Sequence, residues 1–218
     1  MRKRVNGLEW PLTPYQLGAI AIYVFVITSY HVLMYTDTGG KFTVLIIVDV
    51  CLTFVALLCW FIIEYLDPAV CSVSPEYYCQ LCGKRIPKLD HHCLWLNTCI
   101  GARNVRYFHL LIGTLFVQEG MQLVMLAMSS LWSVHYWLGG INKVSCLLIC
   151  HTLACGVMWV GVTLLVCFHL YLQLIVGKTT YDWLISRSSW YACIRLCLLF
   201  TRFSRAEKNY KLHSYCFV

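Results

Sequence analysis

Four long runs of apolar residues divide the sequence, and polar or charged residues gather between them. A helix needs roughly 20 apolar residues to cross the hydrocarbon core of a bilayer. The last run exceeds that length, so we expect it to tilt or to continue as a helix beyond the membrane. The pattern predicts four transmembrane helices, over Leu17–Tyr35, Thr43–Ile63, Phe108–Leu131 and Leu147–Val176.

The polar stretches between these runs set the domain organisation. A long loop, Glu64–Tyr107, separates two helical hairpins. Asp67-Pro68 ends the helical continuation of the second span, because the residue before a proline disfavours the α region. The tail 177–218 is basic with interspersed aromatic residues, so we expect it to lie along the membrane surface. The sequence contains no internal repeat, and it predicts one all-α membrane domain over residues 1–218.

Composition and charge support this class and orient it. Apolar residues make up 60% of the chain and charged residues 12%, whereas soluble domains are about a quarter charged. Of the 17 Lys and Arg, only Lys41 and Lys143 fall in the two short loops between spans. By the positive-inside rule, both termini and the long loop face the cytosol. The first apolar run is too long for a cleaved signal peptide, so we expect it to be retained.

The candidate chemistry lies in the long loop. Asp90-His91-His92-Cys93 places a thiol beside two imidazoles and a carboxylate, and Cys residues at metal-ligand spacing flank it. A cysteine attacks as thiolate, and a histidine oriented by a carboxylate can take its proton. Four residues are of the type that zinc prefers as ligands, namely Cys79, Cys82, His92 and Cys99. If they bind zinc, His91 and Cys93 are left free for chemistry. A purely structural zinc knuckle with an inert Cys93 is the alternative interpretation.

This segment resembles the core of the DHHC protein S-acyltransferases, or palmitoyltransferases. The likeness runs from Asp90 to Phe108 and includes Asn97, Cys99 and Asn104. Outside it, three shorter segments are similar to motifs of the same family. They are Asp67-Pro68-Ala69 (a DPG-type motif), Thr179-Thr180-Tyr181-Asp182 (a TTxE motif with Asp for Glu) and, more weakly, Asn6-Gly7-Leu8-Glu9-Trp10-Pro11.

The resemblance implies a reaction and its residues. Cys93 would attack the thioester of a fatty acyl-CoA such as palmitoyl-CoA and then pass the acyl group to a protein cysteine. His91 would act as general base and Asp90 would hold its tautomer, while Thr180 would hydrogen-bond Asp90. Trp95 is expected to pack against the bilayer or the acyl groove. Several basic residues are candidates for the CoA phosphates, namely Lys84, Arg85, Lys88, Arg103 and Arg106.

The metal count departs from the family. Members usually hold two zinc ions with six cysteines and two histidines, but this loop has only Cys71, Cys79 and Cys82 before the DHHC motif. In one alignment the ligands missing from the first site fall at Tyr78 and Arg85; in another, a stretch after Cys82 is deleted. Either alignment leaves one complete set, so we expect a single zinc ion. The alternative function is a catalytically inactive four-span adaptor folded around that ion.

Further expectations concern the spans and the surroundings of the protein. Asp49 and Glu119 lie within spans, where polar contacts inside the bundle are favoured over a transport pathway. His151 and His169 are expected to form interhelical hydrogen bonds. The partners expected are the lipid bilayer and cytosol-facing membrane proteins with juxtamembrane cysteines, in the endoplasmic reticulum or Golgi. No nucleic-acid module accompanies the net charge of +7, so we expect no nucleic-acid partner.

Overall fold

The computed structural model describes residues 4–38, 43–70, 73–129 and 143–186. Lys41, Cys71 and most of the tail lie outside these ranges. The last two residues of the third predicted span, 130 and 131, also lie outside them.

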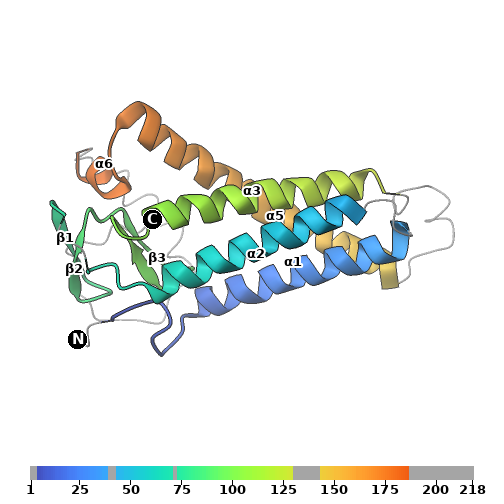
Figure 1. Cartoon of the computed structure of the whole chain (residues 1–218), viewed down its shortest axis with the longest axis horizontal. Coiled ribbons are helices and arrows are strands. Elements are labelled where there is room, and N and C mark those ends of the chain that lie inside the picture. The colour runs from blue at the N-terminus through green and yellow to red at the C-terminus, as the bar shows by residue number, and fades with distance from the viewer. Residues whose placement is uncertain (1–3, 39–42, 71–72, 130–142, 187–218) are drawn as a thin grey trace, which may run out of the picture.

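Four helices are long and apolar enough to cross a membrane, as the sequence predicted. They are α1 (Pro14–Thr38), α2 (Thr43–Tyr65), α3 (Val105–Ala127) and α5 (Lys143–Tyr171), the last of which continues as the π-helix η2 (Leu172–Val176). A short helix, α6 (Thr180–Ser186), follows. In Figure 1 helices α1, α2 and α3 run side by side, α5 crosses behind them at an angle, and the smaller elements gather at one end of the bundle.

Local signals explain where helices begin and end. Pro14 opens α1, where its missing N–H costs nothing, and the Thr13 hydroxyl accepts a hydrogen bond from the Gln16 N–H at 3.2 Å. Gly177, with a φ of 65°, ends η2 in the left-handed conformation that favours glycine, and its N–H bonds Leu172 O at 2.8 Å. The chain therefore turns sharply at Gly177 into the segment that carries Thr180.

Polar contacts lie inside the bundle, where α3 packs against both α2 and α5. Asp49 accepts hydrogen bonds from Gln118 and Gln122, at 3.4 and 2.9 Å, which agrees with the expected role in packing. His151 Nδ1 lies 2.8 Å from the Ser29 hydroxyl of α1, an interhelical bond of the predicted kind. The buried carboxylate of Glu119 has no hydrogen-bond partner among the described residues.

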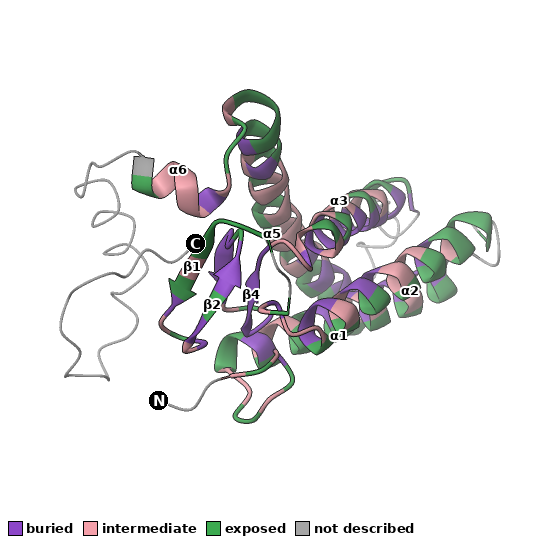
Figure 2. Cartoon of the chain, turned by 60° about the vertical axis from the view of Figure 1, so that its left-hand side comes forward, coloured by how far each residue is buried: buried purple, intermediate pink, exposed green. Residues whose placement is uncertain are grey.

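The long loop folds into two antiparallel β-hairpins, which the sequence analysis did not anticipate. Strand β1 (Glu76–Cys79) pairs with β2 (Lys84–Pro87), and β3 (His91–Cys93) pairs with β4 (Thr98–Ile100). Figure 2 shows them at the end of the helices, with much of β2 and β4 buried. The second hairpin shares an apolar core with the bundle, formed by Cys93, Leu96, Ile100, Tyr23, Ala56, Cys59, Ile63, Phe108, Leu111, Ile112 and Leu115.

The segment before α1 contacts the turns of both hairpins. Arg4 N donates to Cys82 O at 3.0 Å, and Gly7 N donates to Glu64 O at 2.8 Å. A Cβ at Gly7 would lie only 2.6 Å from Leu96 O, so only glycine permits this approach. The segment 4–13 thus ties the loop to α2 through backbone contacts.

A buried chain of side-chain hydrogen bonds continues this connection. The Gln16 amide donates to Glu64 Oε1 at 2.9 Å and to Gly7 O at 3.2 Å, and its oxygen accepts from Asn97 Nδ2 at 3.2 Å. Trp60 Nε1 also donates to Glu64, at 2.7 Å. Gln16, Glu64 and Asn97 are all buried. Because buried polar groups are costly when unpaired, this network favours one position of the turn that follows β3.

We predict that Gln16→Leu lowers the free energy of unfolding by about 1–3 kcal/mol for each group left unpaired, since Glu64 and Asn97 then lose a buried partner. Thermal unfolding in detergent measures the change. Thr28→Val, on the exposed face of the same helix, is the control and should stay within about 0.5 kcal/mol. Equal melting curves for Gln16→Leu and the wild type would contradict the prediction.

Candidate active site and metal centre

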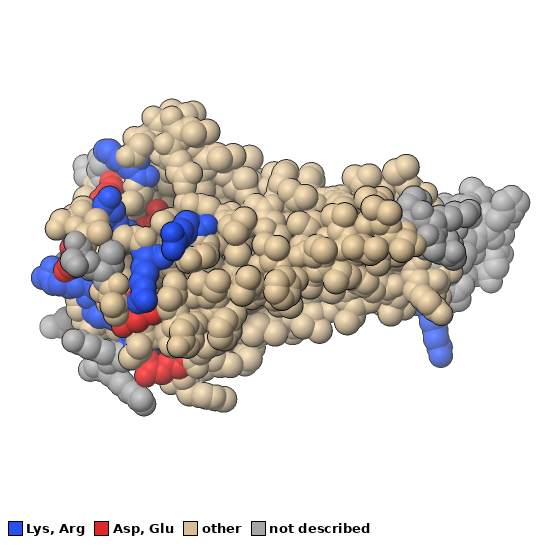
Figure 3. Space-filling model, viewed as in Figure 1, with Lys and Arg blue, Asp and Glu red and all other residues tan. Residues whose placement is uncertain are grey.

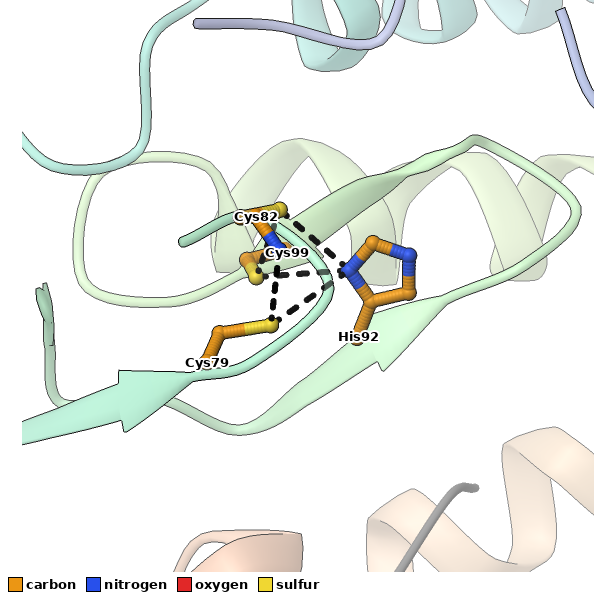
Figure 4. Close-up of side chains that lie close together, drawn as sticks. All are labelled: Cys79, Cys82, His92 and Cys99. Carbon is orange, nitrogen blue, oxygen red and sulfur yellow. Dashed lines mark hydrogen bonds between the residues drawn. The ribbon is translucent and has the colours of Figure 1, made fainter. Parts of the chain in front are cut away.

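Four side chains from both hairpins converge on one point (Figure 4). They are the four residues predicted from spacing, Cys79, Cys82, His92 and Cys99, all buried and with ligand atoms within 4.8 Å of one another. His92 Nδ1 lies 3.7, 3.4 and 3.5 Å from the three sulfur atoms in that order, and Cys82 Sγ lies 3.4 Å from Cys99 Sγ.

These distances fit a tetrahedral metal ion. Zinc bonds of about 2.3 Å to sulfur and 2.0–2.1 Å to nitrogen separate the donor atoms by roughly 3.5–3.8 Å. The three thiols and one imidazole also form a donor set that structural zinc sites use. The described residues therefore contain a cluster that could hold a metal ion, between α2 and α3.

The hairpin geometry brings the cluster together. Cys79 ends β1 and Cys82 lies in the turn that leads to β2, where the Gly83 N–H donates to Cys79 O at 2.9 Å. His92 and Cys99 face each other across the second hairpin. Asn104 holds the exit of β4, because its amide donates to Cys99 O and its oxygen accepts from the Gly101 N–H, both at 2.9 Å.

The positions proposed for missing ligands are explained by the first hairpin. Tyr78 and Arg85 pair directly across β1 and β2, and both are exposed. Neither is a metal ligand, and each contributes to a regular antiparallel pair instead. Cys71 lies outside the described residues, so the number of metal ions stays a prediction.

On the other face of β3 lie the residues predicted for catalysis. Successive side chains of a strand point to opposite faces, so His91 and Cys93 share one face while His92 takes the other. The Asp90 carboxylate binds His91 Nδ1 at 2.7 Å. Thr180 donates to the same carboxylate twice, from its N–H at 2.9 Å and from its hydroxyl at 2.8 Å. The hydrogen bond expected between Thr180 and Asp90 is thus present.

The electrostatics of this group follow from its contacts. Burial alone would raise the pKa of Asp90. The hydrogen bonds from His91 and Thr180 have the larger, opposite effect and lower this pKa to about 2, so the carboxylate stays ionised. Burial lowers the pKa of His91, whereas its hydrogen bonds with Asp90 and Cys93 raise it to about 9. A histidine with a raised pKa accepts a thiol proton readily, and here Cys93 is beside it.

Cys93 lies where the loop meets the apolar bundle. It is only 7% exposed and belongs to the core cluster that includes Phe108 and Leu111 of α3. Trp95, two residues on, is 55% exposed and packs edge-on against Tyr15 at the start of α1, with 5.8 Å between ring centroids. The Cys93 sulfur therefore borders the apolar interior, and Trp95 lies at the surface near the first turn of α1.

Helix α6 is docked by a contact that sequence reasoning missed. The Tyr77 hydroxyl donates to Asp182 Oδ1 at 2.7 Å, and the Thr179 hydroxyl donates to Asp182 Oδ2 at 2.9 Å. Tyr77 also packs on Tyr181, with ring centroids 4.4 Å apart. Nothing in the spacing of Tyr77 marked it for this role, because its partner lies 105 residues away.

Two of the five basic residues expected at the CoA phosphates form hydrogen bonds with other groups of the protein instead. Lys84 is 9% exposed and binds Asp67 and the Val5 carbonyl. Arg103 donates to Asp67 O at 2.9 Å. Asp67, from the DPG-type motif, thus anchors the loop with both cations. The remaining three are exposed, namely Arg85, Lys88 and Arg106.

Comparisons with known proteins agree with this geometry. The sequence model of the DHHC palmitoyltransferase family matches residues 70–187, more than half of the chain. The chain belongs to the DHHC palmitoyltransferase family. The match begins after the DPG-type motif and ends with α6, so it includes every residue of the metal cluster and of the Asp90 group.

Individual members of the family are also similar. "Probable protein S-acyltransferase 15" of Arabidopsis thaliana is 28% identical over 53% of this chain and 45% of its own length. "Palmitoyltransferase ZDHHC15A" of Danio rerio is 30% identical over 51% of this chain and 34% of its own. "Palmitoyltransferase ZDHHC3" of Homo sapiens is 42% identical over 21% of this chain and 16% of its own. The chain thus spans less than half the length of each of these relatives.

Proposed function

We propose that this chain is a protein S-acyltransferase that carries a fatty acyl group, such as palmitoyl, from acyl-CoA to a protein cysteine. The observation that supports this most strongly is the sequence of contacts from Thr180 through Asp90 and His91 to Cys93. It matches the logic of a nucleophile, a base and a group that orients the base. The names of the relatives point to the same reaction.

The first half-reaction loads the enzyme. His91 takes the proton of the Cys93 thiol, and the thiolate attacks the carbonyl carbon of the acyl-CoA thioester. The bond from that carbon to the CoA sulfur breaks, and the leaving thiolate receives the proton from His91. Ionised Asp90 holds the imidazole in the tautomer that this transfer needs and stabilises its protonated form.

The second half-reaction reverses these roles. His91 takes the proton of the substrate cysteine, whose thiolate attacks the acyl group on Cys93. The Cys93 sulfur leaves and receives that proton. One thioester is exchanged for another at each step, so neither step needs a further reactant.

The apolar surroundings of Cys93 suit the acyl chain. Each methylene removed from water contributes about 0.8 kcal/mol, and the core residues beside Cys93 continue into the bundle. The exposed Arg85, Lys88 and Arg106 are candidates for the CoA phosphates outside it. In Figure 3 the Lys and Arg side chains gather at the hairpin end of the molecule, whereas the helices are largely without charge.

We infer that the hairpin end faces the cytosol, where acyl-CoA is found, and that the membrane is that of the endoplasmic reticulum or Golgi. The positive-inside distribution of Lys and Arg supports this orientation. The protein substrates would then be membrane proteins with cysteines close to the cytosolic surface, because Cys93 borders the membrane-spanning core.

We also propose that the metal is zinc, one ion per chain, held by Cys79, Cys82, His92 and Cys99. It would supply folding free energy and fix the positions of the two hairpins, as structural zinc does in small domains. The three thiols with one imidazole, all buried, support zinc over harder ions that prefer oxygen.

The central prediction concerns Cys93. We expect a clickable palmitoyl-CoA analogue to label the purified protein through a thioester that hydroxylamine removes, and Cys93→Ser to remain unlabelled. The hydroxyl of serine is far less nucleophilic than a thiolate, so the label should vanish. Equal labelling of both proteins, or none of a folded wild type, would favour the inactive adaptor.

A second prediction concerns Thr180. Thr180→Val loses the hydroxyl bond to ionised Asp90, which is worth about 1.5–3 kcal/mol, so labelling of Cys93 should slow by about tenfold to a hundredfold. Thr180→Ser keeps the hydroxyl and serves as the control, with a rate close to that of the wild type. Single-turnover labelling measures both, and a normal rate in Thr180→Val would contradict the role.

A third prediction concerns the metal. Elemental analysis of protein purified without added metal should give one zinc per chain, and Cys79→Ala should lose it together with most of its thermal stability, because structural zinc contributes about 10 kcal/mol or more. Cys51→Ala, on the exposed face of α2, should retain the ion. Two zinc ions in the wild type would show that the ligand count is wrong.

A further inference from the structure

His169 has an unusual environment for a histidine near the end of a membrane helix. It is 4% exposed, and its Nε2 has no hydrogen-bond partner among the described residues. Its Nδ1 lies 3.4 Å from His109 Nε2. Leaving a buried nitrogen without a partner costs about 1–3 kcal/mol. We therefore expect His169 Nε2 to bind a partner, such as an ion, in some state of the protein.

The groups around His169 are metal ligands by type. Three buried residues, Asp90, His91 and His169, each offer one ligand atom, and these three atoms lie within 4.8 Å of one another. The rings of His91 and His169 have centroids 5.9 Å apart. Two imidazoles and a carboxylate, with one position left for water, form a donor set found in zinc enzymes.

The outer contacts also fit a metal site. Histidines that bind metals usually have a second partner that fixes the ring, and ligating carboxylates are themselves hydrogen-bonded. His109 faces Nδ1 of His169, and the Gln173 amide lies 3.0 Å from His109 Nδ1 and 2.9 Å from its Nε2. Asp90 has both hydrogen bonds from Thr180. His169 and Asp90 therefore each have a second partner that fixes the position of the side chain.

We propose that Asp90, His91 and His169 form a second, reversible site for a divalent transition cation such as Zn²⁺, and that its occupation inhibits acyl transfer. The site contains no sulfur, so it should bind more weakly than the Cys79 cluster. A cation there takes the imidazole and carboxylate that Cys93 needs to lose its proton. The inhibition rests on the proposed function, whereas the binding site does not.

Binding is tested by calorimetric titration of Zn²⁺ into the purified chain in lipid nanodiscs, with the Cys79 cluster already loaded. We expect the wild type to take up a further cation and His169→Gln to take up none. His151→Gln is a matched control, because His151 lies on the same helix, is also buried and also has an unpartnered Nε2 among the described residues, but belongs to neither of the two ligand clusters found there. It should bind the further cation as the wild type does.

Several outcomes would overturn the site. They are an absence of further uptake by the wild type, equal uptake by His169→Gln, or loss of uptake in His151→Gln as well. His169→Phe keeps the aromatic packing with Phe108 without a ligand atom, and it repeats the test where the glutamine variant does not fold. Retained zinc at the Cys79 cluster identifies folded variants.

Inhibition is tested by labelling of Cys93 with and without the added Zn²⁺. Relative to its own rate without the added Zn²⁺, the wild type should slow by about tenfold or more, while His169→Gln should slow far less. Equal inhibition of both would assign the effect to another group, such as the Cys93 thiol, and overturn the proposal. If no protein is labelled, the proposed function fails, and the titration still decides the cation site.

Discussion

The alternation of side chains along β3 is the constraint on which the proposed chemistry depends. His91, His92 and Cys93 are adjacent in sequence, but a strand sends neighbours to opposite faces. One histidine therefore joins the thiol cluster and the other joins Asp90, with Cys93 on the same face as the second. A helix or an irregular loop through these residues would not separate the two imidazoles in this way. The cluster of ligands thus fixes, through the backbone, the direction in which the base points.

Distant segments hold this short strand in place. The segment before α1 bonds Cys82 and α2, and the Gln16 network reaches Asn97 in the turn after Cys93. From the other side, Thr180 reaches Asp90 across 90 residues of sequence. Both connections cross from the membrane helices to the hairpins. Hydrogen bonds to the helices therefore restrain the loop in addition to the contacts within its thiol cluster.

The loop lies on the bundle where the apolar core of the helices meets the charged, exposed end of the molecule. Cys93 packs against apolar residues of the helices, whereas Trp95 and the exposed basic residues lie at the surface. A thioester has the same division, with an apolar acyl chain on one side of the reacting carbon and a highly charged CoA on the other. The same closeness to α3 and α5 brings His169 beside His91, which the reaction as proposed does not require. Packing on the helices therefore creates both the boundary at which we propose that the substrate binds and the neighbouring set of potential metal ligands.

The four spans could be predicted from the sequence, because their length and hydropathy are local properties. The four converging residues of the thiol cluster could be predicted as well, because their spacing and chemical type are diagnostic. The sequence also indicated the Asp90, His91 and Cys93 group, through a motif contained within a few residues. Other features follow from the folded chain alone: the loop forms hairpins, Lys84 and Arg103 bond Asp67, and Gln16, Tyr77 and His169 lie near the site. These contacts join residues far apart in the chain, and their partners are set by how the helices pack rather than by any local pattern.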